Sequence, residues 1–128
     1  MKPGVLLTIA SLLSILLMTF HLTGDIVHGM EKGGASNLVA VPILVVWLYG
    51  TLVLAERRSG YVITLLGSLL ASGMPVIHMM GAGVGGEFAK SSGASFFIWT
   101  LIALGVTGTF SVILSVRGLV SRQSGQPR

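Results

Sequence analysis

Four long apolar stretches alternate with short polar or glycine-rich segments along the chain. We expect helices at about residues 5–27, 38–55, 61–80 and 94–116. Each stretch is close to the ~20 residues that a helix needs to cross ~30 Å of hydrocarbon. None shows the alternation of barrel strands, and only helices or closed barrels satisfy the backbone in lipid. The pattern predicts an all-α membrane protein, a four-transmembrane-helix antiparallel bundle, in a single domain over residues 1–128.

The composition indicates that lipid surrounds the chain, and it excludes several kinds of chemistry. Hydrophobic residues make up 52% of the chain and charged residues only 9%, too few polar side chains to cover a soluble domain. The chain has no cysteine, which excludes disulfide chemistry, thiolate nucleophiles and an iron–sulfur cluster ligated by this chain. The segment "GAGVGGE" at 81–87 lacks the Lys-Ser/Thr pair of a phosphate-binding loop. We expect neither nucleotide nor nucleic acid as a partner.

The basic residues predict how the helices are oriented. With a cytoplasmic N-terminus, six of the eight Lys and Arg residues lie inside: Lys2, Arg57, Arg58, Arg117, Arg122 and Arg128. Only Lys32 and Lys90 lie outside, which agrees with the positive-inside rule. We therefore expect a multi-pass protein of the cytoplasmic (inner) membrane. Both termini would be cytoplasmic, and residues 117–128 would form a short basic cytoplasmic tail.

The end of the first apolar stretch carries an unusual set of polar side chains. The segment "FHLTGDIVHG" contains His21, Asp25 and His28. At about 100° per residue these three residues share one helix face with Met18. Ionisable side chains in transmembrane helices almost always face the bundle interior and mark functional sites. We expect this face to point into the bundle.

The third apolar stretch also carries a histidine near its end, His78 in "SGMPVIHMMG". If both helices start at the inner surface, near Gly4 and Gly60, then His21 and His78 lie at similar heights near the outer boundary. The two histidines could therefore share a site. The predicted ligands are His21, Asp25, His28 and His78, with Met18, Met74 and Met79 as auxiliary ligands.

Several chemistries suit these ligands, and the sequence does not choose among them. Imidazole with carboxylate suits zinc, and imidazole with thioether suits copper. One histidine from each of two helices could instead hold haem b, or the polar groups could relay protons or ions. In a simpler interpretation, His21 and Asp25 only hydrogen-bond each other where the helix reaches water.

The leading functional expectation is an accessory or binding subunit with no enzymatic activity of its own. A small ion or metal transporter, a membrane enzyme that uses the same site and a purely structural subunit are the alternatives. We expect the lipid bilayer as the main partner, with a homo-oligomer or a larger membrane complex as further options.

Small residues predict where the helices approach closely. Gly67 and Ala71 lie on the face of the third helix that carries His78, and Gly108 lies in the fourth helix. Such residues are enriched where transmembrane helices pack. We expect the first and third helices to be direct neighbours, with Gly67 and Ala71 facing the first.

The charge asymmetry can be tested by labelling. A tag fused after Arg128 should report the cytoplasm, because most basic residues lie on that side. A single cysteine at Ser92, in a chain that otherwise has none, should react with an impermeant reagent outside intact cells. Labelling of this cysteine only after lysis would reverse the orientation.

Overall fold

The computed structural model describes the whole chain except residues 30–33, 81–92, 124 and 126–128. In the described part every regular element is helical: α1 (Pro3–Val27), the 3-10 helix η1 (Ala35–Val39), α2 (Ala40–Leu52), α3 (Arg58–Met80) and α5 (Ala94–Gln123). α1, α3 and α5 are long and apolar enough to cross a membrane, and the apolar helix at Asn37–Leu52 is shorter. The expected all-helical fold with four main helices is confirmed.

Several helix ends differ from the expected boundaries: α1 and α3 begin earlier, at Pro3 and Arg58, and α2 begins two residues later, at Ala40. α2 ends at Leu52 rather than Ala55, and the turn that follows includes Glu56 with a positive φ of 66°. α5 continues past Val116 as far as Gln123. The segment expected to be a tail, residues 117–128, therefore begins as helix. Its basic side chains interrupt the apolar sequence but not the backbone hydrogen bonding, because Arg is a good helix former.

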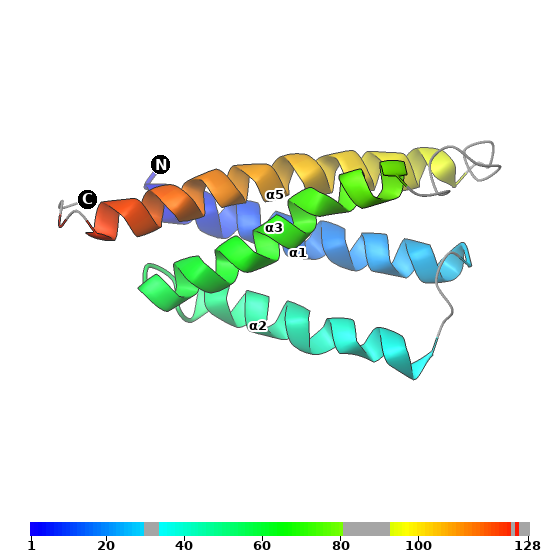
Figure 1. Ribbon diagram of the computed structural model, residues 1–128, viewed down its shortest axis with the longest axis horizontal. Coiled ribbons are helices and arrows are strands. Elements are labelled where there is room, and N and C mark those ends of the chain that lie inside the picture. The colour runs from blue at the N-terminus through cyan, green and yellow to red at the C-terminus, as the bar shows by residue number, and fades with distance from the viewer. Residues whose placement is uncertain (30–33, 81–92, 124, 126–128) are drawn as a thin grey trace.

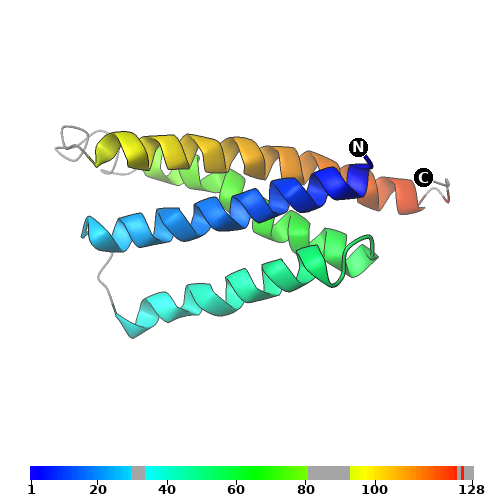
Figure 2. The same ribbon diagram turned by 180° about the vertical axis from the view of Figure 1, so that it is seen from behind.

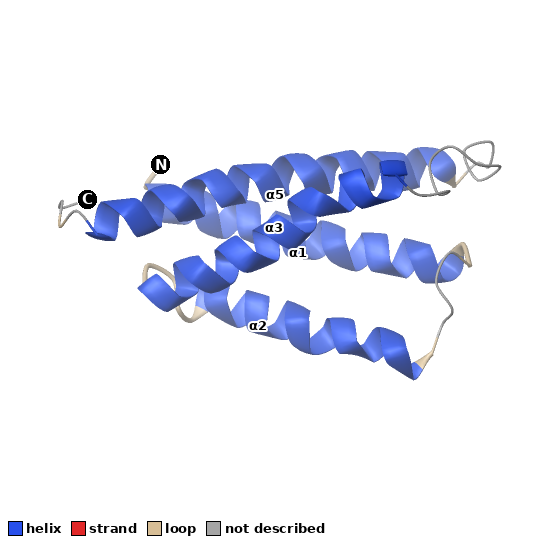
Figure 3. Ribbon diagram, in the orientation of Figure 1, coloured by secondary structure: helices blue, strands red, loops and turns tan. Residues whose placement is uncertain are grey.

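α5 is the helix against which both α1 and α3 pack. Figure 1 shows α5 running alongside both, with α2 on the far side of the bundle from α5. Towards its N-terminal end, α2 diverges from α1, as both views show (Figures 1 and 2). The N-terminal end of α1 and the C-terminal end of α5 lie at the same end of the bundle, where α2 also connects to α3 (Figure 3). The helices α1 and α2 therefore diverge at the end of the bundle opposite to the two termini.

We expected Gly67 and Ala71 of α3 to face α1. Instead, Gly67 approaches α2, and Ala71 lies closest to α5 while sharing the buried core cluster with Met18 of α1. A Cβ atom added to Gly108 of α5 would lie 2.8 Å from the Ser72 backbone nitrogen and 2.9 Å from the Ala71 Cβ atom. A Cβ atom on Gly67 would collide with the indole ring of Trp47 in α2. α1 and α3 make few contacts with each other. Small residues allow close approach wherever they occur, so composition alone did not reveal which helix each would face.

Buried hydrogen bonds attach α2 to α1. The Trp47 indole N–H donates to the Ser11 hydroxyl oxygen at 2.9 Å, and the Ser11 and Thr51 hydroxyl oxygens lie 2.7 Å apart. Thr51 also donates to the Trp47 carbonyl oxygen at 2.9 Å. Hydrogen bonds of this kind contribute about 0.6 kcal/mol each between transmembrane helices. They hold α2 against α1 over the half of α2 that joins α3.

The close approach of α3 and α5 yields a stability prediction. Gly108→Ala should lower the free energy of unfolding in detergent by about 1–3 kcal/mol, because the new methyl group meets backbone atoms that cannot move aside. Gly73→Ala is the matched control, since its Cβ atom would meet nothing within 4 Å. That change should be neutral or stabilising by up to ~1 kcal/mol. Equal effects of the two substitutions in a denaturation experiment would contradict this packing.

Candidate metal centre

α1 buries the face on which His21 and Asp25 lie. Its buried residues recur every three or four positions: Leu7, Ala10, Ser11, Ser14, Met18, His21 and Asp25. His21 is 1% exposed and Asp25 is 6% exposed. One turn separates the two residues, and the His21 Nε2 atom lies 3.5 Å from the Asp25 Oδ2 atom. The imidazole and the carboxylate thus meet inside the bundle, near the C-terminal end of α1.

His78 reaches the same carboxylate from α3. Its Nδ1–H donates to the Met74 carbonyl oxygen at 3.0 Å, one turn earlier in the helix. A carbonyl oxygen only accepts, so this bond assigns the proton to Nδ1 and leaves the Nε2 lone pair available. The His78 Nε2 atom lies 3.7 Å from the Asp25 Oδ2 atom. A backbone carbonyl that orients an imidazole in this way is the usual outer partner of a metal-binding histidine.

Together, His21, Asp25 and His78 present three ligand atoms that all lie within 4.8 Å of one another. In tetrahedral coordination with metal–ligand bonds of 2.0–2.1 Å, neighbouring ligand atoms are about 3.4 Å apart. The two measured separations, 3.5 and 3.7 Å, are close to this spacing. These three residues could form a metal site with little movement of their side chains.

The buried imidazole of His21 has polar atoms that need a partner. Neither of its ring nitrogens has a hydrogen-bond partner among the described residues. An unsatisfied polar group inside a protein costs on the order of 1–3 kcal/mol, and native structures rarely leave one. A cation between His21, Asp25 and His78 would give the His21 Nε2 atom its missing partner.

Phe97 of α5 forms the wall behind the two histidines. Its ring centroid lies 5.3 Å from that of His21 and 5.5 Å from that of His78, and the residue is 2% exposed. One to two turns further along, Leu101 and Leu104 are also buried. An apolar wall lowers the local dielectric and strengthens the interaction between a cation and its ligands.

A cavity of ≈ 500 Å³ opens on the other side of the site, towards η1 and the start of α2. It is lined by His21, Leu22, Asp25, Ile26, Asn37, Ala40, Met74, Ile77 and His78. Among the described residues, the site is therefore closed by α5 and opens into this cavity on the side of η1 and α2. A metal held by three protein ligands would have its fourth position facing this cavity, the arrangement found in sites that bind water or substrate.

Of the remaining predicted ligands, only Met74 lies beside these three residues. His28 is exposed, and its Nδ1–H donates to the Gly24 carbonyl oxygen at 2.7 Å. Met74 lines the cavity, whereas Met18 packs in the apolar core, and Met79 is 75% exposed. Helical periodicity placed His28 on the same face, but α1 ends at Val27 and His28 follows the last turn.

Sequence reasoning missed Phe97 and Asn37, which complete the surroundings of the site. Phe97 starts the apolar face of α5 that packs on α1 and α3, and Asn37 lies in η1. Asn37 immediately precedes the second apolar stretch, as expected for a residue at the same boundary as His21. Phe97 had no such signal, because an aromatic residue in an apolar helix is usually lipid- or core-facing.

The arrangement does not fit a haem held between the two histidines. The rings of His21 and His78 touch edge to face, with centroids 4.5 Å apart and an interplanar angle of 79°. Two axial imidazoles must instead lie on opposite faces of a porphyrin, which would have to pass between them. The Asp25 carboxylate beside both rings occupies the space that the macrocycle would need.

Comparison with models of protein families, with curated proteins and with solved structures finds no match to this chain. The chemistry of the site must therefore be judged from its own residues. Two imidazoles and one carboxylate converge at one end of a helical bundle whose long helices suit a membrane.

Proposed function

We propose that this is an integral membrane protein that binds one zinc ion through His21, Asp25 and His78, as a metal-binding accessory subunit. The observation that carries the proposal is the convergence of these three ligand atoms within 4.8 Å of one another, with each histidine nitrogen 3.5 or 3.7 Å from the Asp25 carboxylate. Two imidazole nitrogens and a carboxylate oxygen form a typical zinc donor set. Cu(I) would favour thioether sulfur; Met74 alone of the predicted methionines lines the cavity at the site, whereas Met18 lies in the core and Met79 on the surface. The carboxylate of Asp25 in the cluster favours zinc over Cu(I).

Electrostatics also supports a bound cation. Asp25 is a carboxylate at 6% exposure in an apolar bundle, where a charged side chain is costly to bury. A divalent cation at the site would offset that charge and coordinate the neutral imidazoles at the same time. His21 and Asp25 would then have a reason to be buried together that a hydrogen bond alone does not supply.

The length of the second helix is compatible with a fourth membrane crossing. The 13 residues of α2 rise about 20 Å, and the five of η1 add about 10 Å because a 3-10 helix rises faster. Their sum of about 30 Å equals the thickness of the hydrocarbon core. We propose four spanning segments with both termini cytoplasmic, which puts the zinc centre near the outer face.

The apolar packing below the site favours a protein that binds a metal ion over one that transports ions. Met18, Ala71 and Leu104 meet one to two turns inside the bundle, and each is at most 5% exposed. This apolar cluster separates the histidines from the hydroxyl groups of Ser14 and Thr107, which hydrogen-bond at 3.1 Å. An ion would have to cross the cluster without polar partners.

Zinc titration of protein stripped with a chelator tests the proposal. The wild-type protein in detergent should bind one zinc ion per chain, and His21→Ala or His78→Ala should weaken binding at least about tenfold. Binding should also weaken as the pH falls, because protons compete for the imidazole nitrogens. His28→Ala is the control: this exposed histidine lies outside the cluster, so its loss should leave affinity unchanged. Equal losses in all three variants would contradict the assignment.

Asp25→Asn separates a metal ligand from a structural hydrogen bond. The amide keeps the shape of the carboxylate and one acceptor oxygen, but it replaces the other oxygen with an NH2 donor and loses the charge. For a zinc ligand, the substitution should weaken zinc binding as severely as His21→Ala. Combining the two should cost little more than either alone, because ligands of one site act as a unit. An Asn variant that binds zinc normally would leave Asp25 with a structural role only.

A further inference from the structure

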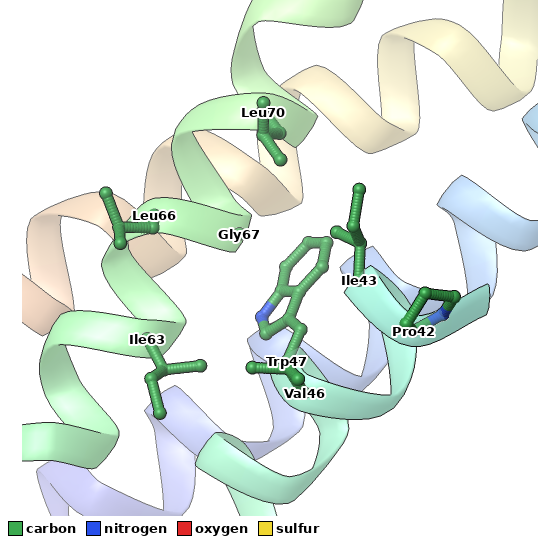
Figure 4. Close-up of a pocket in the computed structure, with 8 residues that line it drawn as sticks. All are labelled: Pro42, Ile43, Val46, Trp47, Ile63, Leu66, Gly67 and Leu70. Atoms are coloured by element: carbon green, nitrogen blue, oxygen red, sulfur yellow. The ribbon is translucent and has the colours of Figure 1, made fainter. Parts of the chain in front are cut away.

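A second cavity lies directly below the proposed zinc centre, between α2 and α3. Its volume is ≈ 340 Å³, and it is lined by Pro42, Ile43, Val46, Trp47, Ile63, Leu66, Gly67 and Leu70. Figure 4 shows Trp47 and Ile43 of α2 facing α3, with the Trp47 ring beside Gly67. Almost every side chain in this lining is apolar, and the Trp47 N–H already donates to Ser11. We call this cavity the α2–α3 groove.

The α2–α3 groove and the cavity at the zinc centre follow consecutive turns of the same two helices. On α3, Leu70 lines the groove and Met74, one turn on, lines the cavity. On α2, Ile43 lines the groove and Ala40 lines the cavity. From Ile63 to His78, α3 rises about 22 Å. A long, thin ligand could therefore lie along α2 and α3 with one end at the histidines.

The charge at the upper end indicates which headgroup would fit. A zinc ion bound by one carboxylate and two neutral imidazoles leaves a net charge of about +1 in an apolar bundle. A fourth ligand that is an oxygen anion would neutralise this charge and complete the tetrahedron. The cavity provides space for such a group beside His21 and His78. Nothing along the α2–α3 groove offers a second charged contact, so the rest of the ligand would be apolar.

We propose that the protein binds a long-chain fatty acid, with its carboxylate on the zinc ion and its alkyl chain in the α2–α3 groove. This ligand rests on the proposed zinc centre. Headgroup and chain contribute separately: the metal selects an anionic oxygen, and the groove selects length through burial of methylene groups. A membrane phospholipid also carries an anionic oxygen, on its phosphate, but it has two acyl chains, whereas the α2–α3 groove is a single cavity of ≈ 340 Å³.

Binding of a long-chain fatty acid to zinc-loaded protein, measured in detergent, tests both contributions. The acid should bind at least about tenfold more tightly than its methyl ester, which has no anionic oxygen, and than a short-chain acid, which buries fewer methylene groups. Removal of zinc should abolish the preference for the acid over the ester. These comparisons use the wild-type chain and do not depend on a variant folding.

A pair of neighbouring substitutions locates the alkyl chain. Leu70→Trp should fill the α2–α3 groove and weaken binding of the long-chain acid at least about tenfold, with zinc stoichiometry unchanged. Leu69→Trp is the control, because Leu69 is also about half exposed but does not line the groove. It should have no effect.

The possible results distinguish a failure of the fatty-acid proposal from a failure of the zinc proposal. Normal zinc binding with no preference for the acid over the ester would overturn the fatty-acid proposal and leave the metal proposal standing. Tighter binding of a neutral lipid quinone would also overturn it, since the headgroup would then not be an anion. Protein that binds no zinc at all would overturn both.

Discussion

The cost of carrying an ionisable group on an apolar helix is the constraint on which the rest of the structure depends. Asp25 and His21 lie in a helix that is otherwise suited to lipid, so their face must turn inward and find partners there. The partners are His78 from α3 and the wall formed by Phe97 of α5. A bound cation would give one polar atom of each of these three residues a partner, and this is why we place the function at their meeting point.

The site also depends on packing two turns away from it. In lipid, the hydrophobic effect does not drive helices together, so α3 and α5 associate through van der Waals packing. The close approach of Ala71 and Gly108 allows this packing. That contact determines the height of His78 relative to Phe97, and α5 in turn positions α1. α2 is attached differently, by hydrogen bonds among Trp47, Ser11 and Thr51 near the end where it joins α3. Because it is held at that end, it can diverge at the other and leave the cavity beside the histidines.

Local patterns in the sequence predicted much of this arrangement. The rest depends on packing between residues that are far apart in the sequence and was not predicted. Helical periodicity placed His21 and Asp25 on an inward face, and counting residues placed His78 at the same height. Both inferences need only the geometry of single helices. The neighbours of Gly67 and Ala71 could not be inferred in this way, because several helices offer small faces. Phe97 was missed because an aromatic residue in an apolar helix is usually lipid- or core-facing and gives no sign of a site. His28 was misplaced because periodicity ends where the helix does.

X-ray absorption spectroscopy of the zinc-loaded protein tests the central claim most directly, because it reports the atoms bound to the metal. The account predicts four nitrogen or oxygen ligands at about 2.0–2.1 Å, with the outer-shell scattering of two imidazole rings. His78→Ala should reduce that scattering to one ring. A first shell of oxygen atoms alone, with no imidazole contribution, would contradict a zinc centre built from His21, Asp25 and His78.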